Sequence, residues 1–451
     1  MNNDLTIGLV VTLSGRWPRE LPKQRLLEYG QWLKENYNEM KLVIAEDITD
    51  SPVKAQETAR QMKQKGVDLL IMVYGAFSED NLCTCLAEEL KVPIILWAPY
   101  EPPFNGERLK SNALVALTMN SASMRRLKNE HHSVYGSKED PSATAKIKSI
   151  IEAYAVKKQV NGSLFGLFGY RPTGFYNCAF DEGLIRRTFG IRMEETSFKT
   201  VYDRMQQQDS DACNTDMQET SSQYDDSKLP EGHLKKQSML YSALSQIYKE
   251  QGYSIASIKC WPEMGPVQCT PCFAIGRLMD EGILISCEGD VDAGLTLLIQ
   301  NAITGLPCYI SDMIQIDDEK NAFVFWHCGA AAPSLLENKN EAVLRDHPLA
   351  GQGVSFWGAL KQGEVTIARL CNIDGVYKLF LMSGLAVETE MVTPGTMIKV
   401  IIDYPVRDAL ERILEEGIPH HYCLVWKNNV EQLKLVAKIF GIAVIELIKS
   451  P

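Results

Sequence analysis

The chain has 451 residues, which is too long for one small core and predicts two or three domains. Hydrophobic residues make up 45% and charged residues 23%, as in ordinary globular proteins, and no apolar run approaches the roughly 20 residues that span a bilayer. The formal net charge is −11 without a basic stripe, which argues against a nucleic-acid partner. We therefore expect a soluble protein that binds small molecules and has no membrane partner.

The N-terminus and the cysteines indicate the compartment. The segment MNNDLTIGLVVTLSG has no basic stretch and carries Asp4 where an export signal would carry Lys or Arg, so we predict a first strand and a cytoplasmic protein. The twelve cysteines are scattered through apolar stretches and are expected to stay reduced. Cys269 and Cys272 form a CxxC motif without a second one at zinc-site spacing. This favours a buried thiol pair at a helix start over a structural zinc site.

The first third of the chain alternates between two hydrophobic periods. Residues 5–13 form an apolar run, residues 23–37 repeat apolar positions at helical spacing, and the alternation continues to residue 99. Strands that are apolar throughout are buried on both faces, which predicts a parallel sheet with helices on each side. We expect a doubly wound, Rossmann-like α/β domain over residues 1–160.

A second α/β domain of the same kind is predicted over residues 161–310. Its strands and helices are expected in the segments 163–174, 177–190, 254–260, 272–282 and 283–290. Residues 203–233 interrupt this series and are rich in Gln, Ser and Asp. Such a composition buries little apolar surface, so we assign this polar segment no role.

The pattern changes after residue 310. Residues 354–384 are typical of short strands joined by tight turns, which indicates an antiparallel sheet or barrel, and residues 430–448 return as one helix and one strand. The predicted fold class is therefore α/β, with two consecutive doubly wound parallel-sheet domains followed by a β-rich, antiparallel barrel-like α+β domain over residues 311–451.

Ionisable side chains recur where predicted buried strands end or begin. The run ILISCEGD brings Glu288 to the carboxyl end of a strand, the next apolar run ends at Asp312, and FVFWHCG ends a third one at His327. His421 stands at the start of a fourth such strand. Ligands of open α/β sheets bind at the carboxyl ends of strands, so these side chains are candidates for one site.

Position alone leaves simpler interpretations open. Glu288 also suits the start of a helix, where an acid complements the helix dipole, and the same holds for Asp290 and Asp292. His420 and His421 are adjacent before a predicted strand, and strand alternation would place their rings on opposite faces. At most one of the two rings is then expected in a site.

Three longer motifs resemble a known family over most of the chain. CFAIGRLMDEGILISCEGDVDAGLT, WHCGAAAPSL and HHYCLVWKNNVEQLKLVAKIFGI are similar to the L-fucose and L-arabinose isomerase superfamily of metal-dependent aldose–ketose isomerases. The resemblance to L-fucose isomerases implies that Glu288, Asp312 and His421 are manganese ligands. His327, six residues before a Pro-Ser pair, matches a further ligand of L-arabinose isomerases.

The resemblance extends to the N-terminus. Ile7-Gly8 and Gly15-Arg16 are similar to the first strand and loop of the fucose enzymes, in which an arginine from a neighbouring subunit reaches the sugar. This implies that Arg16 binds substrate. It also implies a homo-oligomer with active sites at subunit interfaces.

The chemistry of these residue types fits the same reaction. Moving a carbonyl between C1 and C2 of an open-chain sugar takes a proton from one carbon to the other through an enediolate, which a divalent cation stabilises. Glu288 and Asp312 would act as base and acid, His421 would complete the metal shell, and His327 would bind metal or sugar. Carboxylates and imidazoles without thiolate suit Mn²⁺, or else Mg²⁺ or Co²⁺.

Three further residues are candidates for sugar binding. Arg16 and Trp17 suit the hydroxyls and the apolar face of a polyol, although Trp17 equally suits packing. Glu263 follows the apolar run 254–260 and is a candidate by the same strand-end argument.

The predicted function is a metal-dependent aldose–ketose isomerase, an intramolecular oxidoreductase of carbohydrate metabolism that acts on a pentose or 6-deoxyhexose. One alternative is a cytoplasmic sugar-binding protein without catalysis, because LTIGLVVTLSG followed by βαβ units also resembles two-lobed periplasmic binding folds. The histidines of the β-rich domain argue against it. The other alternative is a family member with an altered substrate or without isomerase activity.

Overall fold

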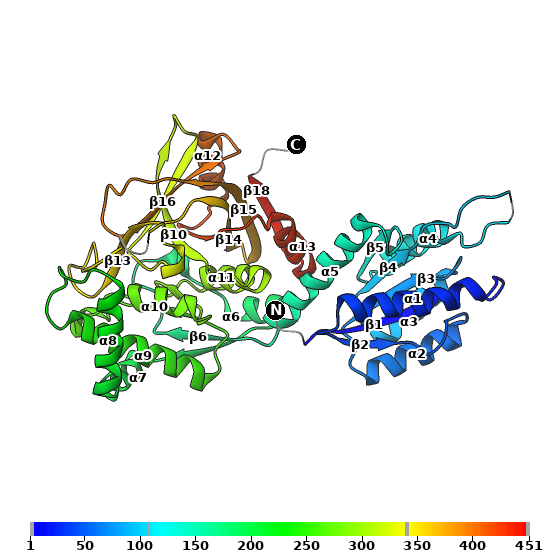
Figure 1. Cartoon of the computed structure of the whole chain (residues 1–451), viewed down its shortest axis with the longest axis horizontal. Helices are drawn as coiled ribbons and strands as arrows, with labels where there is room; N and C mark the ends of the chain where they lie inside the picture. The colour runs from blue at the N-terminus through cyan, green and yellow to red at the C-terminus, as the bar shows by residue number, and fades with distance from the viewer. Residues whose placement is uncertain (1–3, 107, 339–341, 448–451) are drawn as a thin grey trace. The chain divides into compact units, whose positions relative to one another are not determined.

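The computed structural model describes residues 4–106, 108–338 and 342–447 (Figure 1). The chain forms two compact units, Met1–Gln159 and Val160–Pro451. Its α/β class, with parallel sheets and a further mixed, β-rich sheet, agrees with the prediction. The predicted boundary between residues 310 and 311 falls inside the second unit, so the division into three domains stays a prediction. No described helix is both long and apolar enough to cross a membrane.

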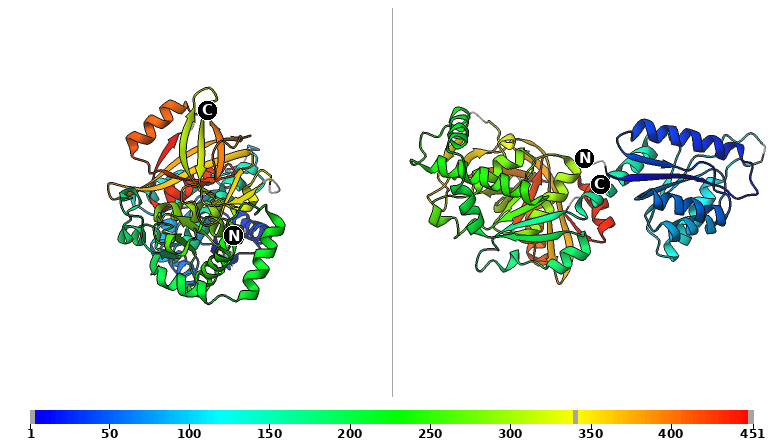
Figure 2. Two further views of the ribbon diagram at one scale, coloured as in Figure 1. Left: turned by 90° about the vertical axis from the view of Figure 1, so that its left-hand side faces the viewer. Right: turned by 90° about the horizontal axis from the view of Figure 1, so that it is seen from below.

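The first unit contains a five-stranded parallel sheet in the order β2-β1-β3-β4-β5. Its strands are β1 (Thr6–Thr12), β2 (Lys41–Ile44), β3 (Leu69–Tyr74), β4 (Ile94–Ala98) and β5 (His131–Tyr135). Its helices are α1 (Glu20–Asn36), α2 (Pro52–Gln64), α3 (Asp80–Leu90), α4 (Ala113–Arg126) and α5 (Pro141–Val160). Every residue of β1, β3 and β4 is buried, because helices cover both faces of the sheet (Figure 2).

The second unit begins with a four-stranded parallel sheet in the order β7-β6-β8-β9. Its strands are β6 (Leu164–Phe168), β7 (Arg192–Thr196), β8 (Ile255–Ile258) and β9 (Ile285–Cys287). Its helices are α6 (Glu182–Phe189), α7 (Phe198–Gln206), α8 (Ser210–Gln223), α9 (His233–Gln251), α10 (Cys272–Asp280) and α11 (Val291–Thr304), with 3-10 turns η1 (Tyr176–Cys178) and η2 (Gly265–Val267). Much of the polar segment 203–233 is helical, since it holds the end of α7 and all of α8.

The remainder of the second unit is a nine-stranded mixed sheet in the order β12-β13-β16-β11-β10-β17-β14-β15-β18. The strands are β10 (Tyr309–Asp317), β11 (Ala322–His327), β12 (Val343–Arg345), β13 (Ser355–Ala359), β14 (Gly363–Ile373), β15 (Val376–Val387), β16 (Thr396–Ile402), β17 (His421–Val425) and β18 (Ala443–Leu447), accompanied by η3 (Pro333–Leu335), α12 (Val406–Glu416) and α13 (Val430–Phe440). Because β16 pairs with both β11 and β15, strands β16, β11, β10, β17, β14 and β15 close into an antiparallel ring.

Helix α11 packs between the parallel sheet and the ring (Figure 1). It contacts β8 and β9 of the sheet and β14 and β17 of the ring. Residues 291–300 are all buried, as expected for a helix that is covered on every side. The start of α11 therefore brings the end of β9 against the ring.

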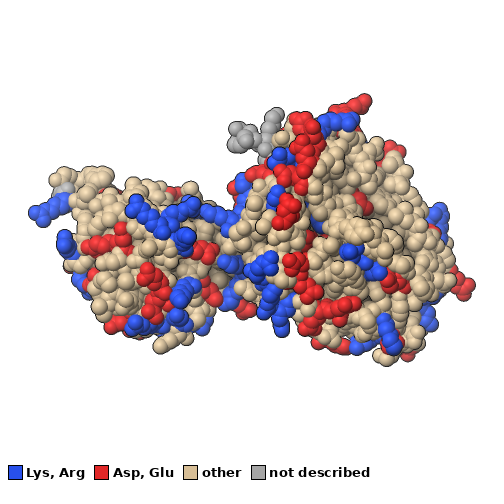
Figure 3. Space-filling model, turned by 180° about the vertical axis from the view of Figure 1, so that it is seen from behind, with Lys and Arg blue, Asp and Glu red and all other residues tan. Residues whose placement is uncertain are grey.

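Charged side chains of both signs intermix on the face of each unit that Figure 3 shows. Lysines and arginines alternate there with aspartates and glutamates over helices and loops. Ion pairs along or between helices of the second unit include Lys199 with Asp203 and Arg204 with Glu250. Such exposed pairs contribute little to stability, so the fold depends on its buried contacts.

Gly276 tests the packing of α10 against the segment that follows His327. A Cβ at Gly276 would lie 2.4 Å from the carbonyl oxygen of Ala331, which belongs to the backbone. We predict that Gly276→Ala lowers the free energy of unfolding by about 1–3 kcal/mol, because backbone must move to admit the methyl group. Urea denaturation followed by circular dichroism measures this change.

Gly358→Ala is the control for this substitution. Its Cβ would lie 3.4 Å from the Leu336 side chain, an ordinary contact, so little change is expected. If Gly276→Ala were as stable as Gly358→Ala, the close approach of α10 to residue 331 would be wrong.

Candidate functional site

Glu288 lies at a sharp turn between a strand and a helix. β9 ends just before it, and both Glu288 and Gly289 have positive φ angles, of 59° and 62°. L-residues rarely adopt this conformation, and such strain is concentrated at functional sites. A Cβ at Gly289 would lie 2.2 Å from the carbonyl oxygen of Tyr170, so a glycine is required there. The turn holds the Glu288 carboxylate at the carboxyl end of the parallel sheet, as predicted.

Strand pairing in the ring brings the other predicted ligands together. His421 of β17 lies directly opposite Asp312 of β10, and on the other side of β10 the same aspartate lies opposite Trp326, the residue before His327. Side chains opposite one another on neighbouring strands lie within contact distance. The expectation that a strand ends at Asp312 is wrong, because pairing with β11 continues β10 to Asp317.

The four predicted residues converge on one point. Nε2 of His421 lies 3.5 Å from Oε2 of Glu288 and 3.7 Å from Oδ1 of Asp312. Ligating atoms of Glu288, His327 and His421 all lie within 4.8 Å of one another. The structure thus brings these four residues together, and we call them the carboxylate–histidine cluster; their role as ligands stays a prediction.

Several atoms of the carboxylate–histidine cluster are buried without a hydrogen-bond partner among the described residues. These atoms are both ring nitrogens of His327, Nε2 of His421 and Oδ1 of Asp312. Buried polar atoms nearly always have a hydrogen-bond partner. A group of nearby nitrogen and oxygen atoms without such partners therefore fits the ligands of a bound metal ion. Oxygen and nitrogen donors suit Mn²⁺, Mg²⁺ or Co²⁺ better than soft metals.

Asp290 orients His421. Its Oδ2 lies 2.8 Å from Nδ1 of His421, so the ring donates its Nδ1 proton to the carboxylate and leaves the Nε2 lone pair facing the cluster. Nη2 of Arg369 donates to Oδ1 of Asp290 at 3.0 Å, and the side chains of Asp290, Arg369 and His421 are all 0% exposed. A carboxylate behind a histidine in this way fixes the tautomer that can bind a metal.

Electrostatics at the cluster favour an ionised Glu288. Burial acts to raise the pKa of Glu288, but the neighbouring His420, His421 and His327 together lower it to about 2. For His421, burial acts to lower the pKa, while the contact with Asp290 and the nearby carboxylates raise it overall. Burial lowers the pKa of His327, against the opposing charge of Asp312. His327 is therefore a neutral imidazole that can donate a lone pair.

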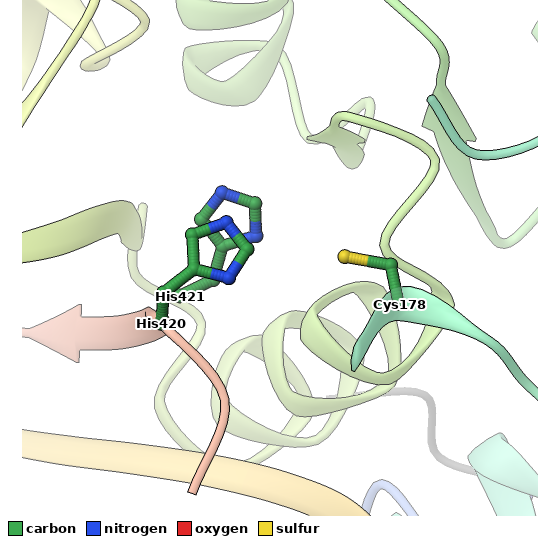
Figure 4. Close-up of side chains that lie close together, drawn as sticks. All are labelled: Cys178, His420 and His421. Carbon is green, nitrogen blue, oxygen red and sulfur yellow. The ribbon is translucent and has the colours of Figure 1, made fainter. Parts of the chain in front are cut away.

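The prediction that the rings of His420 and His421 lie on opposite faces is wrong. Their centroids lie 3.9 Å apart, and both rings lie side by side in Figure 4. His420 precedes β17, so the alternation of an extended strand does not apply to it. Its Nε2 lies 3.6 Å from Glu288, and its Nδ1 lies 2.7 Å from the Asn177 amide. With a side chain 37% exposed, His420 lies at the edge of the cluster.

Cys178 lies beside the two histidines. Its sulfur points toward their rings (Figure 4), and the ligating atoms of Cys178, His420 and His421 lie within 4.8 Å of one another. Burial and the charge of Asp290 raise the pKa of the Cys178 thiol, which keeps it protonated. A thiol is a ligand for soft metals, so we place Cys178 outside the set that fits a hard cation.

The cluster opens into a cleft of about 380 Å³. Glu288 and His327 form part of its wall, together with Trp261. Cys269 and Cys272 also line the cleft as buried free thiols, and Cys272 begins α10. The predicted buried thiol pair at a helix start is thereby confirmed.

Of the weaker candidates, Glu263 belongs to the same unit as the cluster. Glu263 pairs with Lys259 and is not part of the cleft wall. Arg16 and Trp17 follow β1 in the first unit, and their role stays a prediction, as does the homo-oligomer. Sequence reasoning missed Arg369, although a charged residue inside the apolar strand TIARLC was a signal for a buried ion pair.

Comparison with known proteins identifies relatives over most of the chain. A sulfoquinovose isomerase of Priestia megaterium is 24% identical over 416 residues, covering 92% of each chain. That of Alkalicoccus urumqiensis is 25% identical and covers 84% of this chain and 86% of the relative; that of Clostridium sp. is 26% identical and covers 82% and 84%. The predicted resemblance and enzyme class, an aldose–ketose isomerase, are confirmed by these relatives.

Family models and solved structures do not add to the relatives found by sequence. No family model matches the chain. A solute-binding protein of an ABC transporter from Burkholderia multivorans aligns with 67% of this chain and 95% of its own, at 11% identity and a TM-score of 0.19. A score this low supports neither a shared fold nor the sugar-binding alternative.

His347, which lines the cleft, makes a testable pH-dependent contribution to stability. Its Nδ1 accepts hydrogen bonds from the backbone N–H groups of Leu349 and Ala350, both at 3.1 Å, and burial lowers its pKa to about 4. The unfolded chain, with a His pKa near 6.5, binds this proton more readily. The stabilisation is therefore present above pH 6.5 and is lost as the pH falls to 4.

His347→Asn keeps an acceptor for the two N–H groups but does not titrate. We predict that wild type loses about 1–3 kcal/mol of unfolding free energy relative to this variant between pH 7 and pH 4. Urea denaturation at pH 7, 5.5 and 4 measures the difference. Parallel stability profiles for both proteins would contradict the assigned burial of His347.

Proposed function

We propose that this relative of the sulfoquinovose isomerases is a divalent-cation-dependent aldose–ketose isomerase that interconverts sulfoquinovose and the corresponding 2-ketose. The observation that carries the proposal is the convergence of Glu288, Asp312, His327 and His421 at one end of a cleft, with unpaired donor atoms. The relatives, which match 82–92% of this chain, support the substrate. Sulfoquinovose is a 6-deoxyhexose with a sulfonate on C6, so it falls within the sugar class expected from the sequence.

The cluster supplies suitable ligands for the cation. Glu288 and Asp312 would contribute carboxylate oxygens, His421 its Nε2 atom, and His327 a ring nitrogen. A bound divalent cation supplies Lewis-acid polarisation of the sugar carbonyl and of the neighbouring hydroxyl. Because His327 and His421 are almost fully buried, they are held in a poorly solvated environment that strengthens such electrostatic interactions.

Proton transfer falls to the two carboxylates. Glu288 has a low pKa and is therefore a carboxylate that can accept the proton from C2 of the open-chain aldose and return it to C1. Asp312, like Glu288, lies close to Nε2 of His421 and would move the hydroxyl proton between O2 and O1. The aldehyde is reduced as the C2 hydroxyl is oxidised, so the reaction balances without an external electron acceptor.

Metal dependence and substrate are tested by one assay. We predict that protein stripped of metal with a chelator does not convert sulfoquinovose to its ketose, and that added Mn²⁺ restores conversion. L-fucose, D-arabinose and L-arabinose serve as comparison sugars, with ketose formation as the readout. If only a comparison sugar were converted in a metal-dependent way, that sugar would take the place of sulfoquinovose as the proposed substrate. Conversion that is unaffected by the chelator would contradict a role for the cation.

The two adjacent histidines allow a matched test of the metal ligands. We predict that His421→Ala lowers bound Mn²⁺ at least about tenfold, because it removes a buried ligand, whereas His420→Ala retains metal. Metal content is measured after desalting, and circular dichroism establishes that both variants are folded. If the two variants retained equal amounts of metal, the assignment of His421 as a metal ligand would be wrong.

A further inference from the structure

The loop that follows β6 packs against the carboxylate–histidine cluster. Its first residues lie against the turn that carries the cluster, since a Cβ at Gly289 would come within 2.9 Å of Cα of Arg171. Further along the loop, the ring of Phe175 lies 5.8 Å from that of His420 and 5.4 Å from that of Trp261, a residue of the cleft wall. Residues 170–178, which we call the β6 loop, therefore lie beside the Glu288–Gly289 turn, His420 and Trp261.

Arg171 of the β6 loop has few partners for a guanidinium. Its Nε is buried without a hydrogen-bond acceptor, and its Nη1 has a marginal contact of 3.5 Å with the carbonyl of Pro172. The guanidinium carbon lies 5.4 Å from the ring centres of both Tyr170 and Tyr176. Among the described residues, no carboxylate lies within ion-pair distance of Arg171. Two aromatic rings thus flank a guanidinium whose charge no described carboxylate neutralises.

Three other half-buried or buried cations of the second unit are neutralised. Lys259 pairs with Glu263, Arg277 with Asp216, and Arg369 with Asp290. Burying a donor of a charged group without an acceptor is costly. Arg171 is therefore built differently from these structural ion pairs, as a binding residue for an outside anion would be.

We infer that Arg171 binds the anionic group on C6 of the sugar while the carboxylate–histidine cluster acts on C1 and C2. This inference rests on the proposed function, in which C6 carries a sulfonate. A guanidinium presents its N–H groups in a fixed fork that matches two oxygens of a tetrahedral oxyanion. Arg171 lies against Gly289, next to Glu288, and Phe175 of the same loop lies near His420, so the guanidinium belongs to a loop that packs on the cluster that would hold C1 and C2. Arg171 is thus a specificity residue rather than a catalytic one.

Kinetics on a matched pair of sugars tests the inference. Sulfoquinovose and quinovose differ in that the second lacks the sulfonate, and glucose 6-phosphate carries a phosphate there instead. We expect Arg171→Gln to raise KM for sulfoquinovose about 10–100-fold with kcat little changed, and to leave quinovose kinetics unchanged. Arg171→Lys should recover part of the loss, because it restores charge without the fork. Methanesulfonate should inhibit the wild type competitively and Arg171→Gln at least about tenfold more weakly.

Arg192→Gln, at an exposed arginine at the start of β7, is the control and should match wild type on every sugar. Equal changes for sulfoquinovose and quinovose in Arg171→Gln, or no change for either, would overturn the inference while the isomerase and its substrate stand. A wild type that converts glucose 6-phosphate in preference, with the loss again confined to Arg171→Gln, would keep Arg171 as the anion-binding residue and overturn the proposed substrate. A wild type that converts neither anionic sugar would overturn both.

Discussion

The buried contact of Asp290 with Arg369 and His421 is the constraint on which the rest of the site depends. Asp290 caps α11 by accepting a hydrogen bond from the N–H of Ala293 at 2.9 Å, while Arg369 belongs to β14 and His421 to β17. One carboxylate therefore ties the start of the central helix to two strands of the ring. A fully buried ion pair is costly to desolvate and costlier to break, so this link fixes the position of the parallel sheet against the ring.

The same contact determines the electrostatics of the cluster. Arg369 lies behind Asp290 and compensates its charge, which leaves Glu288 and Asp312 with neighbouring histidines rather than a fixed cation. The negative charge of Asp290 also acts on the neighbouring Asp292. Burial, aided by the charge of Asp290, raises the pKa of Asp292 to about 6 even though Arg369 opposes it. Like charges crowded in a poorly solvated place need a positive partner, and a divalent cation between Glu288, Asp312 and the imidazoles would provide it.

The sequence predicted what depends on local pattern. Continuous apolar runs predicted the buried parallel strands, and a buried strand followed at once by a small-residue helix placed Glu288 at a sheet edge. What it missed depends on distant pairing. Asp290 and His421 are 131 residues apart and Arg369 is 79 residues from Asp290, so no spacing rule linked them. Asp290 was assigned as a helix-start acid, which is correct but incomplete. Strand alternation failed at His420 because that residue belongs to the turn before β17.

The carboxylate–histidine cluster and the β6 loop are built from different kinds of structure. The carboxylate–histidine cluster rests on strands β10, β11 and β17 and on the strained turn after β9, all held by strand pairing and buried contacts. The β6 loop carries exposed aromatic rings, such as Tyr176 at 80% exposure. Isomerisation between C1 and C2 is the same chemistry for any aldose, so a rigid cluster can serve many sugars, whereas loops change readily without disturbing the core. Differences in substrate among enzymes that share this cluster are therefore expected in the β6 loop and its neighbours, not in the carboxylate–histidine cluster.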